Sequence, residues 1–250
     1  MMKFKITVLD TPESIAKTVA EEVLAVVKSA IESRGSAELV LTGGTLGIAV
    51  LESMRLLSLT AEISWQKVHI WWGDERFVEI DSLERNDLQA VEAFLRHISI
   101  PASNIHFPET TTNSSSVNEA ADTYTEDLLE HFGSVEAIYF DALLLGIGPD
   151  GHIASLFPGQ DTLDSKSLVV AVTDSPKPPP KRISFSFKTI AKANKIWAFA
   201  SGTGKAKAIE KALNGAHKHE IPLVGVFARD EQYLYLDKEL ATNTSSFPLD

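Results

Sequence analysis

The chain has 250 residues, 44% of them hydrophobic, with no cysteine and a formal net charge of −11. This size allows one large α/β domain or two small ones, while the lack of cysteine excludes disulfides and thiolate metal sites. The acidic balance disfavours nucleic-acid partners, and the absence of a membrane-spanning apolar run or a signal-peptide core leads us to expect a cytoplasmic protein without membrane partners.

Strands and helices are predicted to alternate along the chain. Strands are expected at 4–9, 38–42, 68–72, 141–145, 168–172, 183–187 and 196–200, with helices at 12–34, 45–57, 87–97, 118–132 and 206–213. The alternating segment 183–187 is expected to expose one face, and two further elements at 223–227 and 233–236 close the chain. This order predicts an α/β fold with a mainly parallel sheet covered by helices on both faces, in one domain over residues 1–250.

The most informative segment, GIGPDGHIASLFPG at 146–159, follows the buried strand 141–145. Its glycines and prolines end the strand in a tight turn and present Asp150 and His152 at the carboxyl end, where open α/β sheets place their ligands. Histidine exchanges a proton near neutral pH, and a neighbouring carboxylate orients it or raises its basicity. We therefore expect a catalytic centre here; the alternative is a glycine-rich turn with a surface histidine.

Three glycines of this turn, Gly146, Gly148 and Gly151, also match the G-x-G-x-x-G pattern of dinucleotide-binding folds. That pattern should open a long helix in the first βα unit. Because Pro158 curtails any helix within two turns, we disfavour a nicotinamide or flavin site.

Two glycine-containing loops after predicted strands are candidate anion sites. Thr42, Gly43, Gly44 and Thr45 offer backbone N–H groups at a helix start, which bind phosphate; a plain strand-to-helix turn is the alternative. The loop SGTGK at 201–205 adds the ammonium of Lys205; a solvated lysine at a helix start is the alternative.

The SGTGK loop is similar to the tail of a P-loop, but two positions depart from that motif. Phe199 stands where glycine is needed, and Ala206 replaces the Ser/Thr. A nucleotide triphosphatase is therefore disfavoured.

Two further clusters carry arginine. Asp74 and Arg76 follow the strand 68–72, and Arg182 precedes the strand 183–187. Arginine suits bidentate contact with an anion or a developing oxyanion, and a carboxylate binds sugar hydroxyls; a local salt bridge is the alternative. Since parallel strands end at one edge of a sheet, we expect all these clusters to converge on one pocket.

The remaining histidines are given no role, because none has a carboxylate–glycine context: His69, His97, His106, His131, His217 and His219. No histidine and acidic residues have metal-ligand spacing such as H-x-x-x-H. We therefore predict no catalytic metal.

The motifs LTGGT, WWGDERFV, LLGIGPDGHIASLFPG, KRISFSF and SGTGKAKAI, in this order, resemble the 6-phosphogluconolactonase family over nearly the whole chain. The wider superfamily includes glucosamine-6-phosphate deaminase, but GDERFV and ASLFPG resemble the lactonase branch. The resemblance implies a Rossmann-like α/β fold, no cofactor, and hydrolysis of 6-phospho-D-glucono-1,5-lactone in the pentose phosphate pathway.

By the same resemblance, His152 matches the general base, Asp150 its neighbouring carboxylate, and Asp74 and Arg76 the active-site GDER motif. The phosphate-binding positions match the 42–45 loop together with Arg182 and Lys205. The expected partner is the small sugar-phosphate lactone, with the protein a monomer or small homo-oligomer. Two rival functions stay open: an amino-sugar phosphate isomerase-deaminase, and a non-catalytic sugar-phosphate sensor.

Overall fold

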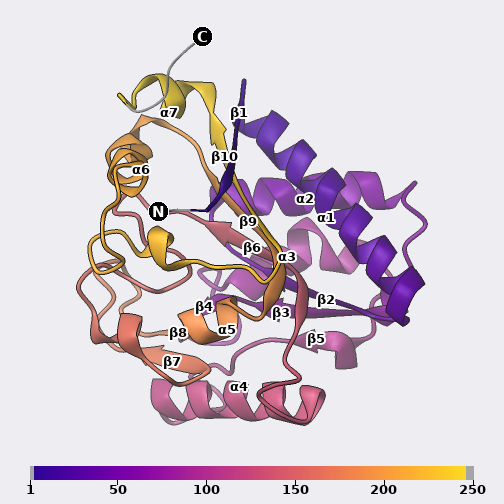
Figure 1. The fold of residues 1–250 in the computed structure, drawn as a ribbon. Helices are drawn as coiled ribbons and strands as arrows, with labels where there is room; N and C mark the ends of the chain where they lie inside the picture. The colour runs from indigo at the N-terminus through magenta and orange to yellow at the C-terminus, as the bar shows by residue number, and fades with distance from the viewer. Residues whose placement is uncertain (1–2, 246–250) are drawn as a thin grey trace.

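A parallel sheet runs through the centre of the computed structural model, which describes residues 3–245 (Figure 1). Its strand order is β1-β10-β9-β6-β2-β3-β5, and every neighbouring pair is parallel. The strands are β1 (Lys5–Leu9), β2 (Ala37–Leu41), β3 (Val68–Trp72), β5 (Ile105–His106), β6 (Phe140–Gly146), β9 (Ala193–Ala200) and β10 (Glu231–Asp237).

A second, smaller sheet is antiparallel and holds β4 (Asp74–Arg76), β8 (Arg182–Phe185) and β7 (Val169–Val172), in that order. It begins where β3 ends, because only Gly73 separates β3 from β4. The small sheet therefore extends the carboxyl edge of the large one.

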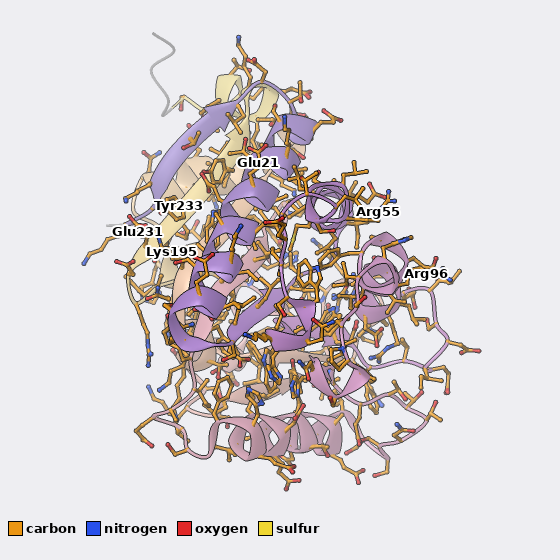
Figure 2. The ribbon with its side chains drawn as sticks, turned by 90° about the vertical axis from the view of Figure 1, so that its right-hand side faces the viewer. Glu21, Arg55, Arg96, Lys195, Glu231 and Tyr233 are labelled. Atoms are coloured by element: carbon orange, nitrogen blue, oxygen red, sulfur yellow. The ribbon has the colours of Figure 1, made fainter. Side chains whose placement is uncertain are left out.

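Helices cover both faces of the parallel sheet. They are α1 (Pro12–Arg34), α2 (Thr45–Ser58), α3 (Asn86–Ala93), α4 (Val117–Phe132), α5 (Phe187–Ile190), α6 (Ala206–Leu213) and α7 (Lys238–Thr242). One hydrophobic core contains the buried residues of α1, α2 and α3; the other contains those of α4, α6 and the small sheet. Figure 2 shows α1 lying in front of the sheet. The predicted α/β fold, with its covered parallel sheet, is confirmed.

The strands alternate between the two cores with a period of two. Leu39 and Leu41 of β2 pack with α1 and α2, whereas Val40 packs on the opposite face. All three side chains are fully buried. This explains why the strands read as continuous apolar runs in the sequence.

The long helix α1 follows directly from its local sequence. The Thr11 side chain accepts a hydrogen bond from the Ser14 N–H, the Ser14 Oγ accepts one from the Thr11 N–H, and Pro12 occupies the first turn. Gly35 ends the helix at φ 85°, which an L-residue with a side chain adopts only at a cost. The helix buries an apolar stripe that includes Ile15, Val19, Val23 and Val27.

Three predictions of local structure were wrong. β8 is buried on both faces, because Ser184 faces the central turn, where its Oγ accepts from the Ser155 N–H at 3.2 Å; Phe187 already belongs to α5. The helix predicted at 87–97 ends at Ala93 and continues as a 3₁₀ turn at Leu95–His97. The element predicted at 223–227 is a 3₁₀ turn at Pro222–Gly225.

The direction in which successive strands are added to the sheet reverses between β2 and β6. After β2 the chain moves outward to β3, and after β6 it moves the other way to β9. Such a switch point leaves a crevice beyond the carboxyl ends of the two adjacent strands, where open α/β sheets bind their ligands. No helix among residues 3–245 is long and apolar enough to cross a membrane.

Candidate active site

A cavity of about 450 Å³ lies at this switch point. It is lined by every predicted site residue except Asp150, which lies behind His152: Thr42, Gly43, Gly44, Thr45, Asp74, Arg76, His152, Arg182 and Lys205. The clusters predicted to converge therefore do so: four follow β2, β3, β6 and β9, and Arg182 lies at the start of β8.

The turn after β6 fixes the direction of the His152 ring. The Gly148 N–H donates to the His152 carbonyl at 2.9 Å, and Gly151 turns the chain at φ 79°. This places the Asp150 carboxylate directly on Nδ1 of the imidazole. Because Nδ1 is held by the carboxylate, Nε2 is the nitrogen available to a substrate or to water.

Asp150 stays ionised throughout the physiological range. Partial burial acts to raise the pKa of Asp150, but the hydrogen bond to His152, with the charges of His152 and Lys177, outweighs it and lowers the pKa to about 2. A permanent carboxylate on Nδ1 stabilises the imidazolium that forms when the ring accepts a proton. The structure thus assigns Asp150, rather than Asp74, as the neighbour of His152.

Gly148 leaves room for this arrangement, which gives a first prediction. A Cβ at this position would lie 2.0 Å from both Cε1 and Nδ1 of His152 and 2.7 Å from the Asp150 carboxylate. We expect Gly148→Ala to displace the imidazole and lower turnover roughly 100-fold, the usual effect of a displacement of about 1 Å at a reacting group. Initial-rate kinetics would measure this. Binding of inorganic phosphate serves as the control and should persist; turnover close to that of the wild type would contradict the packing argument.

The loop between β2 and α2 lines one end of the cavity. Gly44 is the N-cap of α2 at φ 83° and provides no side chain to cap the helix. The free N–H groups of the first turn, from Thr45 to Gly47, therefore face the cavity with the positive end of the helix dipole.

Four cations line the cavity: Arg76, Lys177, Arg182 and Lys205. Arg76 and Arg182 are directly opposite each other in the β4–β8 ladder. Like charges at such positions are destabilising, so this pair is unfavourable unless an anion lies between or near the two guanidinium groups. The chain as a whole has a net charge of −11, so these four side chains that line the cavity are opposite in sign to the overall charge.

Arg182 also shapes the wall of the cavity. Its Nε donates to the Pro179 carbonyl at 3.2 Å, and its Nη2 donates to the carbonyls of Lys177 and Pro178 at 3.3 and 3.1 Å. Burial lowers the pKa of Arg182, and the charge of Asp74 opposes that change. Arg182 therefore holds the proline-rich link in place and also lines the cavity.

Lys205 lies in the 3₁₀ turn at Thr203–Lys205 that precedes α6. Burial lowers the pKa of Lys205, and the charge of Lys177 adds to this, while Asp237 acts in the opposite direction. Asp237 also accepts from the Gly202 N–H at 3.2 Å, which ties this loop to the end of β10. The lysine is therefore a positioned part of the cavity wall rather than a freely solvated side chain.

Asp74 is held by the turn that follows β6. The Ser155 hydroxyl donates to its carboxylate at 2.7 Å, and both side chains are buried. Asp74 and Arg76 form no direct ion pair among the described residues, so the local salt bridge that the sequence left open is not made. The Asp74 carboxylate keeps an oxygen for a ligand in the cavity.

Glu75, between these two residues, serves the fold instead. Its fully buried carboxylate accepts from the backbone N–H groups of Arg76, Asn86 and Asp87 at 2.7–2.8 Å, and Arg85 approaches it at 3.9 Å. Burial raises the pKa of Glu75 to about 7, against the opposing charge of Arg85. This network fixes the start of α3 against β4.

Two polar residues of the cavity were not predicted. Lys177 lies 3.5 Å from His152 Nδ1 and 3.8 Å from Asp150, and its place between the prolines of the 174–181 link was the available signal. Asn86 donates from Nδ2 to the Asp74 carbonyl at 3.0 Å, while its buried Oδ1 has no partner. An unpaired acceptor on the cavity wall suits a substrate hydroxyl.

The comparison with known proteins agrees with this geometry. The family model described as glucosamine-6-phosphate isomerases/6-phosphogluconolactonase matches residues 10–235. A curated 6-phosphogluconolactonase of Mycobacterium tuberculosis is 38% identical, over 98% of this chain and 100% of the relative. The solved 6-phosphogluconolactonase of Trypanosoma brucei is 26% identical with a TM-score of 0.80, covering 97% of this chain and 99% of that one.

A structure described as a monomeric glucosamine-6-phosphate deaminase shares the fold, with 23% identity and a TM-score of 0.79 over 96% of this chain and 100% of that one. The fold alone therefore does not separate the two activities. The match over residues 10–235 and the 38% identical relative do establish the family. The chain belongs to the glucosamine-6-phosphate isomerase/6-phosphogluconolactonase family.

Proposed function

We propose that this protein hydrolyses 6-phospho-D-glucono-1,5-lactone to 6-phosphogluconate in the oxidative pentose phosphate pathway, with His152 as the general base and without a catalytic metal. The observation that carries the proposal is an imidazole with a carboxylate on Nδ1, facing a cavity lined by cations and a helix N-terminus. The 6-phosphogluconolactonases among its relatives support the same substrate.

The reaction begins when Nε2 of His152 takes a proton from a water molecule, whose oxygen attacks the lactone carbonyl. Negative charge then develops on the carbonyl oxygen, and the Arg76 guanidinium stabilises it. Collapse of the intermediate breaks the bond to the ring oxygen, and the proton held by His152 passes to that leaving oxygen. Asp150 stabilises the imidazolium between the two steps.

The other end of the cavity anchors the phosphate. The N–H groups of the 42–45 loop at the start of α2, together with Arg182 and Lys205, supply donors and positive charge. Asp74 and Asn86 offer oxygen acceptors to the sugar hydroxyls between the two ends. Anchoring at a group that does not react places the carbonyl against His152.

A coupled assay separates this function from its rivals. Freshly prepared lactone, with 6-phosphogluconate detected by a dehydrogenase, should be consumed well above its spontaneous rate of hydrolysis. An isomerase-deaminase would instead release ammonia from glucosamine 6-phosphate. A sensor would bind either sugar phosphate without turning it over. Ammonia release in place of lactone turnover would overturn the proposal.

Removing either phosphate-anchoring cation gives a second prediction. We expect Lys205→Ala and Arg182→Ala to weaken binding of product and of inorganic phosphate roughly 10- to 100-fold, since a charge-assisted hydrogen bond contributes about 1.5–3 kcal/mol. Arg76→Ala should lower turnover more than it weakens phosphate binding, because Arg76 is assigned to the carbonyl end. Phosphate inhibition of lactone turnover, measured for all three variants, would test this.

The opposite pattern would show that the phosphate end and the carbonyl end of the cavity have been assigned the wrong way round. If Arg76→Ala abolished inhibition by phosphate while Lys205→Ala and Arg182→Ala left it intact, the phosphate would lie against β4. The lactone carbonyl would then lie against α6.

A further inference from the structure

Three histidines from separate segments meet on the α4 side of the sheet, away from the cavity. His69 lies on β3, His106 on β5 and His131 on α4. One ligand nitrogen of each ring lies within 4.8 Å of those of the other two, and His69 Nδ1 is 3.2 Å from His106 Nε2. These three histidines are tens of residues apart in the sequence and form no short metal-ligand motif there, so the cluster can be recognised only in the folded structure.

Two carboxylates hold the outer nitrogens of this cluster. Asp127 contacts Nδ1 of His106 at 2.9 Å, and Glu38 contacts Nε2 of His131 at 2.9 Å. A carboxylate on one imidazole nitrogen fixes the proton there and leaves the lone pair of the other nitrogen free. His106 therefore offers Nε2 and His131 offers Nδ1, which is the pairing of histidine with an outer carboxylate that recurs at metal sites.

The surrounding rings keep these orientations rigid. Trp71 stacks on His106 with ring centroids 3.8 Å apart and an angle of 5° between the rings, and its indole N–H donates to Glu38 at 2.8 Å. The His131 side chain is 20% exposed and that of His106 11%, so water and a small ion can reach the cluster. The ligand set is therefore preorganised but not sealed.

We propose that His69, His106 and His131 bind one divalent transition-metal ion, with zinc the best match, and leave a fourth position to water. Three imidazole nitrogens with a water molecule form a tetrahedral set that suits zinc. With zinc–nitrogen bonds of about 2.0–2.1 Å, ligand nitrogens in such a tetrahedron lie roughly 3.3 Å apart. The 3.2 Å between His69 and His106 meets that requirement.

This site is structural and separate from the proposed hydrolysis. Asp74 lies five positions after His69 along the chain, which corresponds to at most roughly 16 Å at about 3.3 Å per residue. A bound ion would link α4 to β3 and the short edge strand β5, which are already paired with each other in the sheet. Its binding energy would therefore add to the stability of this edge of the sheet.

Zinc titration of the full chain, stripped by a chelator and returned to metal-free buffer, tests the proposal. We expect calorimetry to show one zinc ion per chain, and zinc at 100 times its dissociation constant to raise the thermal midpoint by roughly 5–10 °C. Cobalt(II) at the same site should give the visible absorption of a tetrahedral complex. Lactone turnover should be the same in the stripped and loaded protein, so the result does not depend on the proposed function.

Three variants make the test specific. His131→Gln should abolish stoichiometric binding, and Asp127→Asn, which keeps all three ligands, should weaken it roughly 10- to 100-fold. His219→Gln is the matched control, because this histidine pairs with Asp164 elsewhere on the surface, and it should bind zinc as the wild type does.

Two results would overturn the site. The first is a wild-type chain that binds no zinc, in which case the cluster is a hydrogen-bonded chain from Asp127 through His106 to His69. The second is stoichiometric zinc that survives His131→Gln but is lost in His219→Gln. The cobalt spectrum and Asp127→Asn keep the test valid if His131→Gln does not fold.

Discussion

Replacing His152 with asparagine is expected to preserve the fold and to lower lactone turnover by roughly two to four orders of magnitude, the usual contribution of a general base. Asparagine keeps a polar side chain of similar reach beside Asp150, but it cannot accept a proton from water near neutral pH. Because the ring is partly exposed at the cavity and contacts Phe157 on one side, little core packing is lost. The rate is measured with fresh lactone after subtraction of spontaneous hydrolysis.

Two controls accompany this variant. Its thermal midpoint should lie close to that of the wild type, and inorganic phosphate should still bind, since Lys205 and the start of α2 are untouched. A folded His152→Asn protein that turned over the lactone at nearly the wild-type rate would remove the imidazole from the mechanism.

The largest expected effect on stability comes from Arg85→Met. The Arg85 side chain is fully buried, and its guanidinium bonds Asp87 through Nε at 2.8 Å and Nη2 at 2.7 Å. Methionine fills much of the space but leaves the buried carboxylates of Glu75 and Asp87 without their cation. Removing one partner of a buried ion pair costs about 3–5 kcal/mol, so we expect the thermal midpoint to fall by roughly 6–20 °C.

The loss of folding stability caused by Arg85→Met should also increase with pH. The pKa of Glu75 in the folded wild type is raised to about 7 by burial, and the positive charge of Arg85 limits that rise. Without Arg85 the carboxyl holds its proton more strongly in the folded state, so folding becomes less favourable as pH rises above the unfolded value near 4.5. Unfolding at pH 5 and pH 8 should therefore show the larger loss at pH 8.

Arg96→Met is the matched control. This arginine pairs with Glu92 one helical turn away at the surface, and Figure 2 shows Arg96 pointing away from the sheet. Exposed pairs of this kind contribute only about 0.3–0.5 kcal/mol, so its unfolding should differ little from that of the wild type. Equal and small effects of Arg85→Met and Arg96→Met would show that the buried network adds no stability.

The sequence was informative where function and local structure share one segment. Asp150 and His152 lie two residues apart in a glycine-rich turn after an apolar strand, so both their place and their contact could be predicted. The 42–45 loop was predictable for the same reason, because glycine and a helix start are local signals. The convergence of these loops followed from the rule for parallel sheets.

Residues whose roles depend on distant partners were missed. Lys177 lies beside Asp150 and His152 in a proline-rich link whose carbonyls are bound by Arg182. Ser184 was expected on an exposed face, yet the small sheet packs under the central turn and buries it. The histidine cluster depends on the pairing of β3 with β5 and the packing of α4, which no short-range pattern records.

The opposed Arg76 and Arg182 also bear on how substrate arrives. At long range an anionic sugar phosphate approaches a chain of net charge −11 and is repelled. Attraction by the cations of the cavity outweighs this repulsion only within about one Debye length, roughly 8–10 Å at physiological salt. Moderate salt therefore screens the long-range repulsion by the acidic surface before it weakens the contacts between the ligand and the cavity. The rate of ligand capture and the affinity should then respond to ionic strength in different ways. The cationic lining determines how long a ligand stays, while the acidic exterior determines how often one enters.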